Sequence, residues 1–124
     1  MTAAGWLAFL AAAAIGAPAR YVVDRLVTAR TTSVAPWGTF VVNVSGCFLL
    51  GVITGLGRSH DLGSTAQTVI GTGGLGAYTT FSTFSFEVVR LAEAGEVPLA
   101  GRYVVGSLAA GTIAAAAGLA LAAL

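Results

Sequence analysis

The sequence predicts an all-α integral membrane protein with four transmembrane helices, the third of them broken near its middle. Of the 124 residues, 56% are hydrophobic and 9% are charged, whereas a soluble domain has about 25% charged residues. The few charged residues delimit four uncharged runs: 1–19, 31–57, 62–86 and 103–124. Each run approaches or exceeds the roughly 20 apolar residues that a spanning helix needs. We therefore expect a single domain, residues 1–124, with helices at about 4–28, 35–57, 65–93 and 98–123.

Composition also excludes several classes of protein. Helices are required because a polar backbone in lipid must satisfy its own hydrogen bonds, and no ten-residue alternating segments of a membrane barrel are visible. The lone Cys47 makes no internal disulfide, and one Cys with one His is too few for a zinc site. A net charge of +1 leaves no footprint for nucleic acid, and no nucleotide-binding motif is present. We therefore expect neither nucleic acid nor a nucleotide as a partner, and we do not expect an enzyme.

The first helix, 4–28, contains a possible processing signal. Ala17-Pro18-Ala19 resembles a signal-peptidase site, but no basic residue precedes Arg20, whereas a signal peptide has a basic N-terminal region. Three further spans follow, so we interpret this segment as a retained helix. Arginines are concentrated in the first and third connections, and a simple positive-inside count places both termini outside.

The second helix, 35–57, carries an amide in its middle. Asn43 costs free energy in hydrocarbon unless it is hydrogen-bonded. Thr39, Asn43 and Cys47 are four residues apart and share one face of the helix. Two interpretations are open: Asn43 holds neighbouring helices together, or it belongs to a binding site.

The third segment, 65–93, has a composition that disfavours a continuous helix. Four glycines lie within residues 71–76 and five hydroxyl residues within 79–85. Glycine is a poor helix former, and Ser and Thr compete for backbone hydrogen bonds. We predict a break near residues 74–80, where unwound backbone must be buried in protein or line a wet cavity. The alternative is a close-packed continuous helix whose hydroxyls bond the carbonyls of their own preceding turn.

The residues after this break sort onto two faces. Phe81 and Phe84 share one face; they are either ordinary packing or rings that present their positive edges to an anion. A polar ladder occupies the neighbouring face: Thr80, Thr83, Glu87 and Arg90. A carboxylate within the membrane is a functional candidate. The alternative for Glu87 is an interfacial ion pair with Arg90.

The fourth helix, 98–123, places Tyr103, Ser107 and Gly111 four residues apart, with Thr112 beside them. Tyr103 is either an interfacial anchor or, with Ser107, part of a hydroxyl-lined path. Small residues are abundant in all four segments and allow helix backbones to approach closely. Because four helices leave little room for a pore and its wall, we expect a homo-oligomer, in the first place a dimer.

Three segments together resemble the CrcB/Fluc family of fluoride channels: Gly16-Ala-Pro-Ala-Arg-Tyr21, Gly38-Thr-Phe-Val-Val-Asn-Val-Ser-Gly-Cys-Phe48 and Gly76-Ala-Tyr-Thr-Thr-Phe-Ser-Thr-Phe-Ser-Phe-Glu87. The resemblance covers the chain in order, with matching length and number of segments. It implies an antiparallel, dual-topology homodimer with two pores at the subunit interface. It also implies passive loss of fluoride from the cytoplasm across the cell inner (plasma) membrane. Some members of the family work instead as heterodimers of two one-way subunits.

The resemblance also assigns roles to residues. Phe81 and Phe84 would be rings whose edges meet fluoride, and Asn43 would donate to fluoride or hold the rings. The backbone carbonyls of Gly76 and Thr79 would hold a structural sodium ion at the dimer centre. Further candidates for the fluoride pathway are Thr39, Ser82, Thr83, Tyr103, Ser107 and Thr112. The vestibule or structural charges are Arg20 and Glu87.

The chain departs from the family pattern at three positions. Ala77 and Tyr78 replace a glycine and an aliphatic residue in the break, which puts the sodium geometry in question. Gly111 replaces a hydroxyl residue, which shortens the path along the fourth helix.

Two other functions fit the sequence less well. A small multidrug exporter needs a carboxylate in its first helix, and residues 1–23 contain none. A scaffold subunit accounts for the small residues but leaves the glycine break and the Thr-Thr-Phe-Ser-Thr-Phe-Ser run unexplained.

Overall fold

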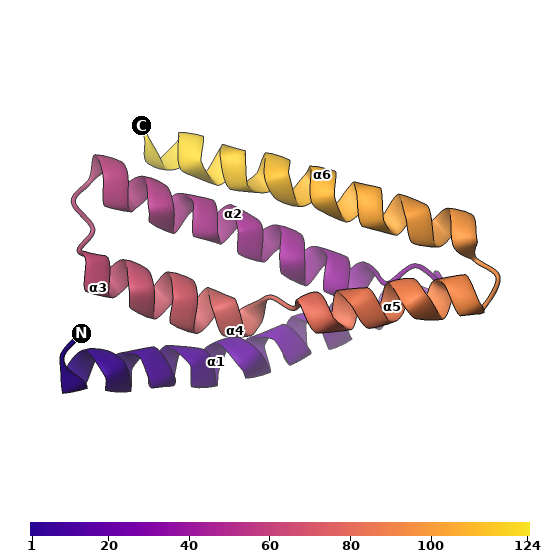
Figure 1. Ribbon diagram of the computed structural model, residues 1–124, viewed down its shortest axis with the longest axis horizontal. Helices are drawn as coiled ribbons and strands as arrows, with labels where there is room; N and C mark the ends of the chain where they lie inside the picture. Colours follow the sequence, from indigo (N-terminus) through magenta and orange to yellow (C-terminus); the bar gives the residue numbers. More distant parts are fainter.

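The computed structural model describes all 124 residues and contains helices but no strands (Figure 1). Its elements in chain order are α1 (Ala3–Thr28), α2 (Trp37–Ser59), α3 (Ser64–Gln67), η1 (Thr68–Leu75), α4 (Gly76–Tyr78), α5 (Phe81–Glu93) and α6 (Val97–Ala122). Three of them, α1, α2 and α6, are long and apolar enough to cross a membrane. The remaining segment, which is third in chain order and is called the third span below, consists of two shorter pieces, one from α3 to α4 and the other α5. The chain is a multi-pass membrane protein.

Close backbone contact through glycine joins α2 to α6. A Cβ on Gly51 would collide with the Ala115 carbonyl, and a Cβ on Gly118 would collide with the Phe48 carbonyl. Only a hydrogen side chain allows the two helices to approach this closely, which is how small residues promote packing in lipid. Gly55, one turn after Gly51, lies against Ala122. Both glycines are therefore part of the contact between α2 and α6.

Little of the chain is buried within a single subunit. Val42 is the one large side chain that is fully buried, while 22 large hydrophobic side chains are exposed. A soluble protein does not expose apolar surface on this scale. The exposed side chains therefore face lipid or another protein subunit.

The third span leaves the helical conformation at two threonines. Thr79 has ψ of 160° and Thr80 has φ of −147° and ψ of 122°, so both residues are extended. This break lies within the predicted interval, but the glycines before it remain helical. They form the π-helix η1 and the short α4, which the sequence analysis did not anticipate.

The glycines stay helical because they pack against α1. Gly16 and Gly74 approach so closely that a Cβ on Gly16 would strike the Gly74 carbonyl, and Gly73 lies against Phe9. Before the break, the glycines of the third span therefore belong to a close-packed helix, which was the alternative to a break among the glycines. The break itself belongs to the hydroxyl run that follows.

Candidate functional site

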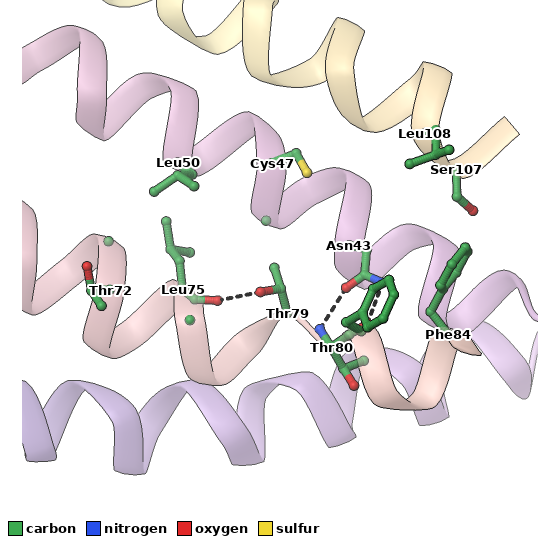
Figure 2. Close-up of a pocket in the computed structure, with 14 residues that line it drawn as sticks. Asn43, Cys47, Leu50, Thr72, Leu75, Thr79, Thr80, Phe84, Ser107 and Leu108 are labelled. Carbon is green, nitrogen blue, oxygen red and sulfur yellow. Dashed lines mark hydrogen bonds between the residues drawn. The ribbon is translucent and has the colours of Figure 1, made fainter. Parts of the chain in front are cut away.

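A cavity of about 490 Å³ lies where the third span breaks. Fourteen residues line it, drawn from α2, η1, α4, the break, α5 and α6 (Figure 2). Six of the residues singled out from the sequence are among them: Asn43, Gly76, Thr79, Phe81, Phe84 and Ser107. The fold thus gathers residues that are up to 64 positions apart in the chain.

Asn43 holds the break by two hydrogen bonds to one residue. Its Nδ2 donates to the Thr80 carbonyl at 2.8 Å, and its Oδ1 accepts from the Thr80 amide at 2.8 Å (Figure 2). Thr80 also caps α5, since its Oγ1 accepts from the Thr83 amide at 3.2 Å. The amide of Asn43 therefore replaces the backbone partners that Thr80 loses on leaving the helix.

The same bonds deprive two carbonyls of their helical partners. In a continuous helix the Gly76 carbonyl would accept from the Thr80 amide and the Thr79 carbonyl from the Thr83 amide. Those amides donate instead to Asn43 and to the Thr80 hydroxyl. Carbonyls without helical partners at a broken membrane helix are the ligands that such helices offer to cations, so the chemistry of these two residues fits the sodium site that the family resemblance implies.

Arg20 lies beside one of these carbonyls. Its guanidinium Nη1 donates to the Thr79 oxygen at 3.4 Å, a long hydrogen bond. Arg20 is half-buried in α1, and its hydrogen bond to Thr79 stabilises the backbone at the break. The family resemblance suggests either a vestibule charge or a structural charge for Arg20, and the hydrogen bond to the Thr79 carbonyl is what a structural charge would make.

The two phenylalanines differ in burial. Phe81 is 79% exposed, and its ring centroid lies 5.9 Å from that of Phe84. Phe84 is half-buried against the small core cluster of Leu91, Ala100 and Tyr103, with its centroid 5.0 Å from that of Tyr103. Within one subunit, the Phe84 ring is packed against the core, and the exposed Phe81 ring can contact a second molecule.

Glu87 is bound by hydroxyls rather than by an arginine. Thr39 Oγ1 donates to Glu87 Oε1 at 2.8 Å, and the Tyr103 hydroxyl donates to Oε2 at 2.9 Å. The Arg90 guanidinium instead lies 5.8 Å from the centroid of the Phe86 ring. Glu87 and Arg90 therefore do not form the ion pair that one interpretation of the sequence predicted. Tyr103 is a buried hydrogen-bond partner of Glu87 rather than an interfacial anchor.

Ser107 has a buried hydroxyl without a hydrogen-bond partner. Ser107 is one of the residues that line the cavity, with Asn43 and Phe84 (Figure 2), and its Oγ atom is itself buried. Buried polar atoms are almost always paired, so an unpaired one beside a cavity marks a place where a guest with matching polarity would be stabilised.

The remaining predicted residues lie around this cavity rather than in it. Thr39, Thr83 and Arg20 line a second, smaller cavity of about 220 Å³, together with Asp24 and Thr80. The exposed Ser82 hydroxyl lies 3.4 Å from that of Thr80. Thr112 is exposed and donates to the Leu108 carbonyl at 2.7 Å, so one subunit does not bring it to the other pathway candidates.

Sequence reasoning undervalued Thr80 and missed Ser45. Thr80 was placed on a helix face, but it is the extended residue before α5, and threonine is a preferred N-cap. Ser45 lies 2.9 Å, hydroxyl to hydroxyl, from Tyr78, one of the three departures from the family pattern. This bond connects the end of α4 to α2, and a serine directly before Gly46 in the sequence gave no sign of it.

The comparison with known proteins decides the family. Residues 7–119 match the family described as CrcB-like protein, Camphor Resistance (CrcB). The chain belongs to the CrcB family. It is 46% identical over 114 residues to fluoride-specific ion channel FluC 1 of Streptomyces avermitilis, covering 92% of each chain. It is 48% identical over 122 residues to fluoride-specific ion channel FluC 1 of Frankia casuarinae, covering 94% of this chain and 95% of that one.

A third CrcB relative extends the comparison beyond these two. Fluoride-specific ion channel FluC of Acidobacterium capsulatum is 45% identical over 102 residues, which cover 82% of each chain. All three relatives are channels by name, and none is an enzyme. The broken third span, the Asn43 bonds and the cavity thus belong to a chain of the CrcB family.

Proposed function

We propose that this chain forms a fluoride-selective channel through which cytoplasmic fluoride leaves the cell passively, lowering fluoride toxicity. The observation that carries the proposal is the cavity at the break, where the Phe81–Phe84 pair, the Asn43 amide and the unpaired Ser107 hydroxyl meet. The names of the CrcB relatives supply the ion.

The chemistry of the lining suits a small, strongly hydrated anion. Such an ion must exchange water for other donors, and hydroxyls, an amide and the positive edges of aromatic rings supply them. A conducting site must bind strongly enough for the ion to leave water and weakly enough to release it. Uncharged donors meet both conditions, because they do not trap the anion as a bare arginine would.

The proposed assembly is an antiparallel homodimer in the inner membrane, with two pores at the interface. The exposed Phe81 supports this arrangement, since an aromatic ring that is 79% exposed beside a cavity is a natural surface for a partner subunit. The carbonyls of Gly76 and Thr79 would hold a structural sodium ion at the dimer centre. When bound, that ion supplies a fixed positive charge that favours anions nearby.

Within each pore, the protein's own residues divide the work. Phe81 and Phe84 present ring edges, and Asn43 keeps the start of α5 in position through Thr80. The Ser107 hydroxyl donates to the ion, and Thr39, Ser82, Thr83, Tyr103 and Thr112 are the further polar positions along the route. Glu87 orients the hydroxyls of Thr39 and Tyr103.

The test is ion efflux from proteoliposomes that contain the purified chain alone. We expect rapid fluoride efflux, read with a fluoride electrode, and chloride efflux near the level of protein-free liposomes. Absence of fluoride efflux, or chloride efflux at a similar rate, would refute the proposal. Efflux restored only by adding a related subunit would replace the homodimer with a heterodimer.

A further inference from the structure

Tyr78 lies between the two residues whose carbonyls the broken span leaves without helical partners. It is the last residue of α4, two positions after Gly76 and directly before the extended Thr79. Gly76 and Thr79 line the cavity at the break, whereas Tyr78 is not among the lining residues. Any effect of Tyr78 on the cavity is therefore transmitted through the backbone on either side of it.

The Tyr78 hydroxyl is the first donor in a short chain of hydrogen bonds. The Ser45 Oγ donates its one proton to the Val42 carbonyl at 3.1 Å, because a carbonyl oxygen can only accept. The Tyr78 hydroxyl, 2.9 Å from the same Oγ, is then the donor to Ser45. Val42 carries the one large side chain of the protein that is fully buried. The phenol is thus bound to a buried part of α2, next to Asn43.

Two glycines hold the rest of Tyr78. A Cβ on Gly16 of α1 would lie 3.2 Å from the Tyr78 amide nitrogen, and a Cβ on Gly46 of α2 would lie 3.4 Å from the Tyr78 ring Cδ1. The same Cβ on Gly46 would collide with the Thr79 methyl group. The backbone of Tyr78 therefore packs on α1, while its ring and its hydroxyl contact α2.

We infer that Tyr78 is a positioning residue for the cation site of the proposed channel, and that its hydroxyl acts through Ser45. This inference rests on the proposed function. Helix α2 holds the break on both sides of the Thr79 carbonyl, since Ser45 binds the residue before it and Asn43 binds the residue after it. With both neighbours fixed, the carbonyl has a set direction before a cation arrives. A site that is ordered in advance spares the cation the entropic cost of ordering it.

The direction of the Thr79 carbonyl matters because this oxygen already has one partner. Arg20 Nη1 donates to it at 3.4 Å, which is a long hydrogen bond. A carbonyl oxygen has two lone pairs, so one of them is left for a cation. The orientation of the peptide group between Thr79 and Thr80 decides where that lone pair points. Without the hydroxyl of Tyr78, the ring still packs on Gly46, but the bond that fixes the residue before Thr79 is lost.

The experiment measures thermal unfolding of the purified chain in detergent against Na⁺ concentration, with a bulky organic cation keeping the ionic strength constant. The variants are Tyr78→Phe, Ser45→Ala and the double variant. Tyr21→Phe is the matched control, because it removes the same hydroxyl from a ring that is 65% exposed on α1. Bound Na⁺ stabilises the folded state by mass action once its concentration exceeds the dissociation constant. We expect Tyr78→Phe and Ser45→Ala each to raise this onset concentration about three- to tenfold, the range that one net hydrogen bond provides. The double variant should match either single variant, because both changes break the same hydrogen bond.

A merely structural hydroxyl would lower the unfolding temperature equally at every Na⁺ concentration and leave the onset unchanged. That result would overturn the inference, as would an onset that moves as far in Tyr21→Phe as in Tyr78→Phe. Fluoride efflux gives a second readout, since the deficit of Tyr78→Phe should be present at limiting Na⁺ and vanish at saturating Na⁺. Wild-type stability that is independent of Na⁺ would overturn the inference together with the sodium site. Failure of the wild-type chain to pass fluoride would instead refute the proposed channel, and the Na⁺ onset would still decide the role of Tyr78.

Discussion

At the residue scale, Asn43 is the residue on which the local structure depends most. It satisfies both backbone groups of Thr80, which sits where the third span has no helical hydrogen bonds. A buried backbone group without a partner costs about 1–3 kcal/mol. The geometry favours the interpretation of Asn43 as a residue that holds the rings in place, because Phe81 directly follows Thr80.

Replacing Asn43 by Asp tests this role. The carboxylate cannot donate to the Thr80 carbonyl, and it places an oxygen and a negative charge there instead. We expect fluoride efflux to fall at least about tenfold and the unfolding free energy of the protein to drop by about 1–3 kcal/mol. Liposome efflux and thermal unfolding in detergent provide the measurements. Cys47→Ser, one turn further along α2 in the same cavity, is the control and should retain efflux.

Ser107 offers the converse test, since its hydroxyl has no partner to lose. Ser107→Ala should leave the thermal stability of the protein unchanged or slightly raised. Efflux should nevertheless fall by roughly five- to thirtyfold, which corresponds to about 1–2 kcal/mol of lost ion stabilisation. A large loss of stability with normal efflux would assign Ser107 to packing instead.

The phenylalanine pair is tested by removing the aromatic edge while keeping an apolar side chain. Phe81→Ile and Phe84→Ile should each suppress efflux, because an aliphatic group has no positive edge to offer an anion. The dimer should persist on size-exclusion chromatography. Phe86→Ile, on an exposed ring outside the cavity lining, is the matched control. Normal efflux in both site variants would remove the rings from the pathway.

At the element scale, the contact between α2 and α6 sets the position of Asn43 relative to Ser107. This contact depends on glycine, since Gly118 lies against the Phe48 carbonyl and Gly51 against the Ala115 carbonyl. Neither neighbour is a flexible side-chain end that can move aside. The separation between α2 and α6 is thus so short that only glycine, which has no Cβ, fits at these two positions.

Gly118→Val should therefore force α6 away from α2. We expect a loss of about 1–3 kcal/mol in unfolding free energy, the usual cost of overpacking, together with reduced efflux. Gly101→Ala in the same helix is the control, because a Cβ there meets nothing within 4 Å, and alanine is the better helix former. Thermal unfolding of the two purified variants distinguishes them; equal stabilities would contradict the packing argument.

At the scale of the whole molecule, the exposed apolar surface and the open cavity indicate that one subunit is incomplete. The carbonyls of Gly76 and Thr79, which lack helical partners, are the positions where two subunits would share a cation, and the Thr79 carbonyl also accepts from Arg20. The Tyr78–Ser45 hydrogen bond, at 2.9 Å, secures the end of α4 next to them.

Removal of sodium tests the shared site without relying on transport. Replacing Na⁺ by a bulky organic cation should lower the thermal stability of the dimer, because a ligand bound only by the folded state stabilises it by mass action. Restoring Na⁺ should reverse the change, whereas an equal concentration of the organic cation should not. Stability that is independent of Na⁺ would exclude a sodium ion that holds the dimer together.

The membrane class, the three long apolar helices, the interval of the break and the family could all be predicted from the amino-acid sequence. These follow from composition, from uncharged runs of spanning length and from motifs read along the chain, all of which are local properties. The tertiary structure decided which polar groups pair. Asn43 bonds Thr80 rather than a neighbouring side chain, Glu87 accepts from hydroxyls rather than pairing with Arg90, and the glycines of η1 stay helical against α1. All three depend on contacts between residues 16 to 64 positions apart in the chain. Periodicity places such residues on a face of a helix, but the partner that the face meets is set only when the helices pack.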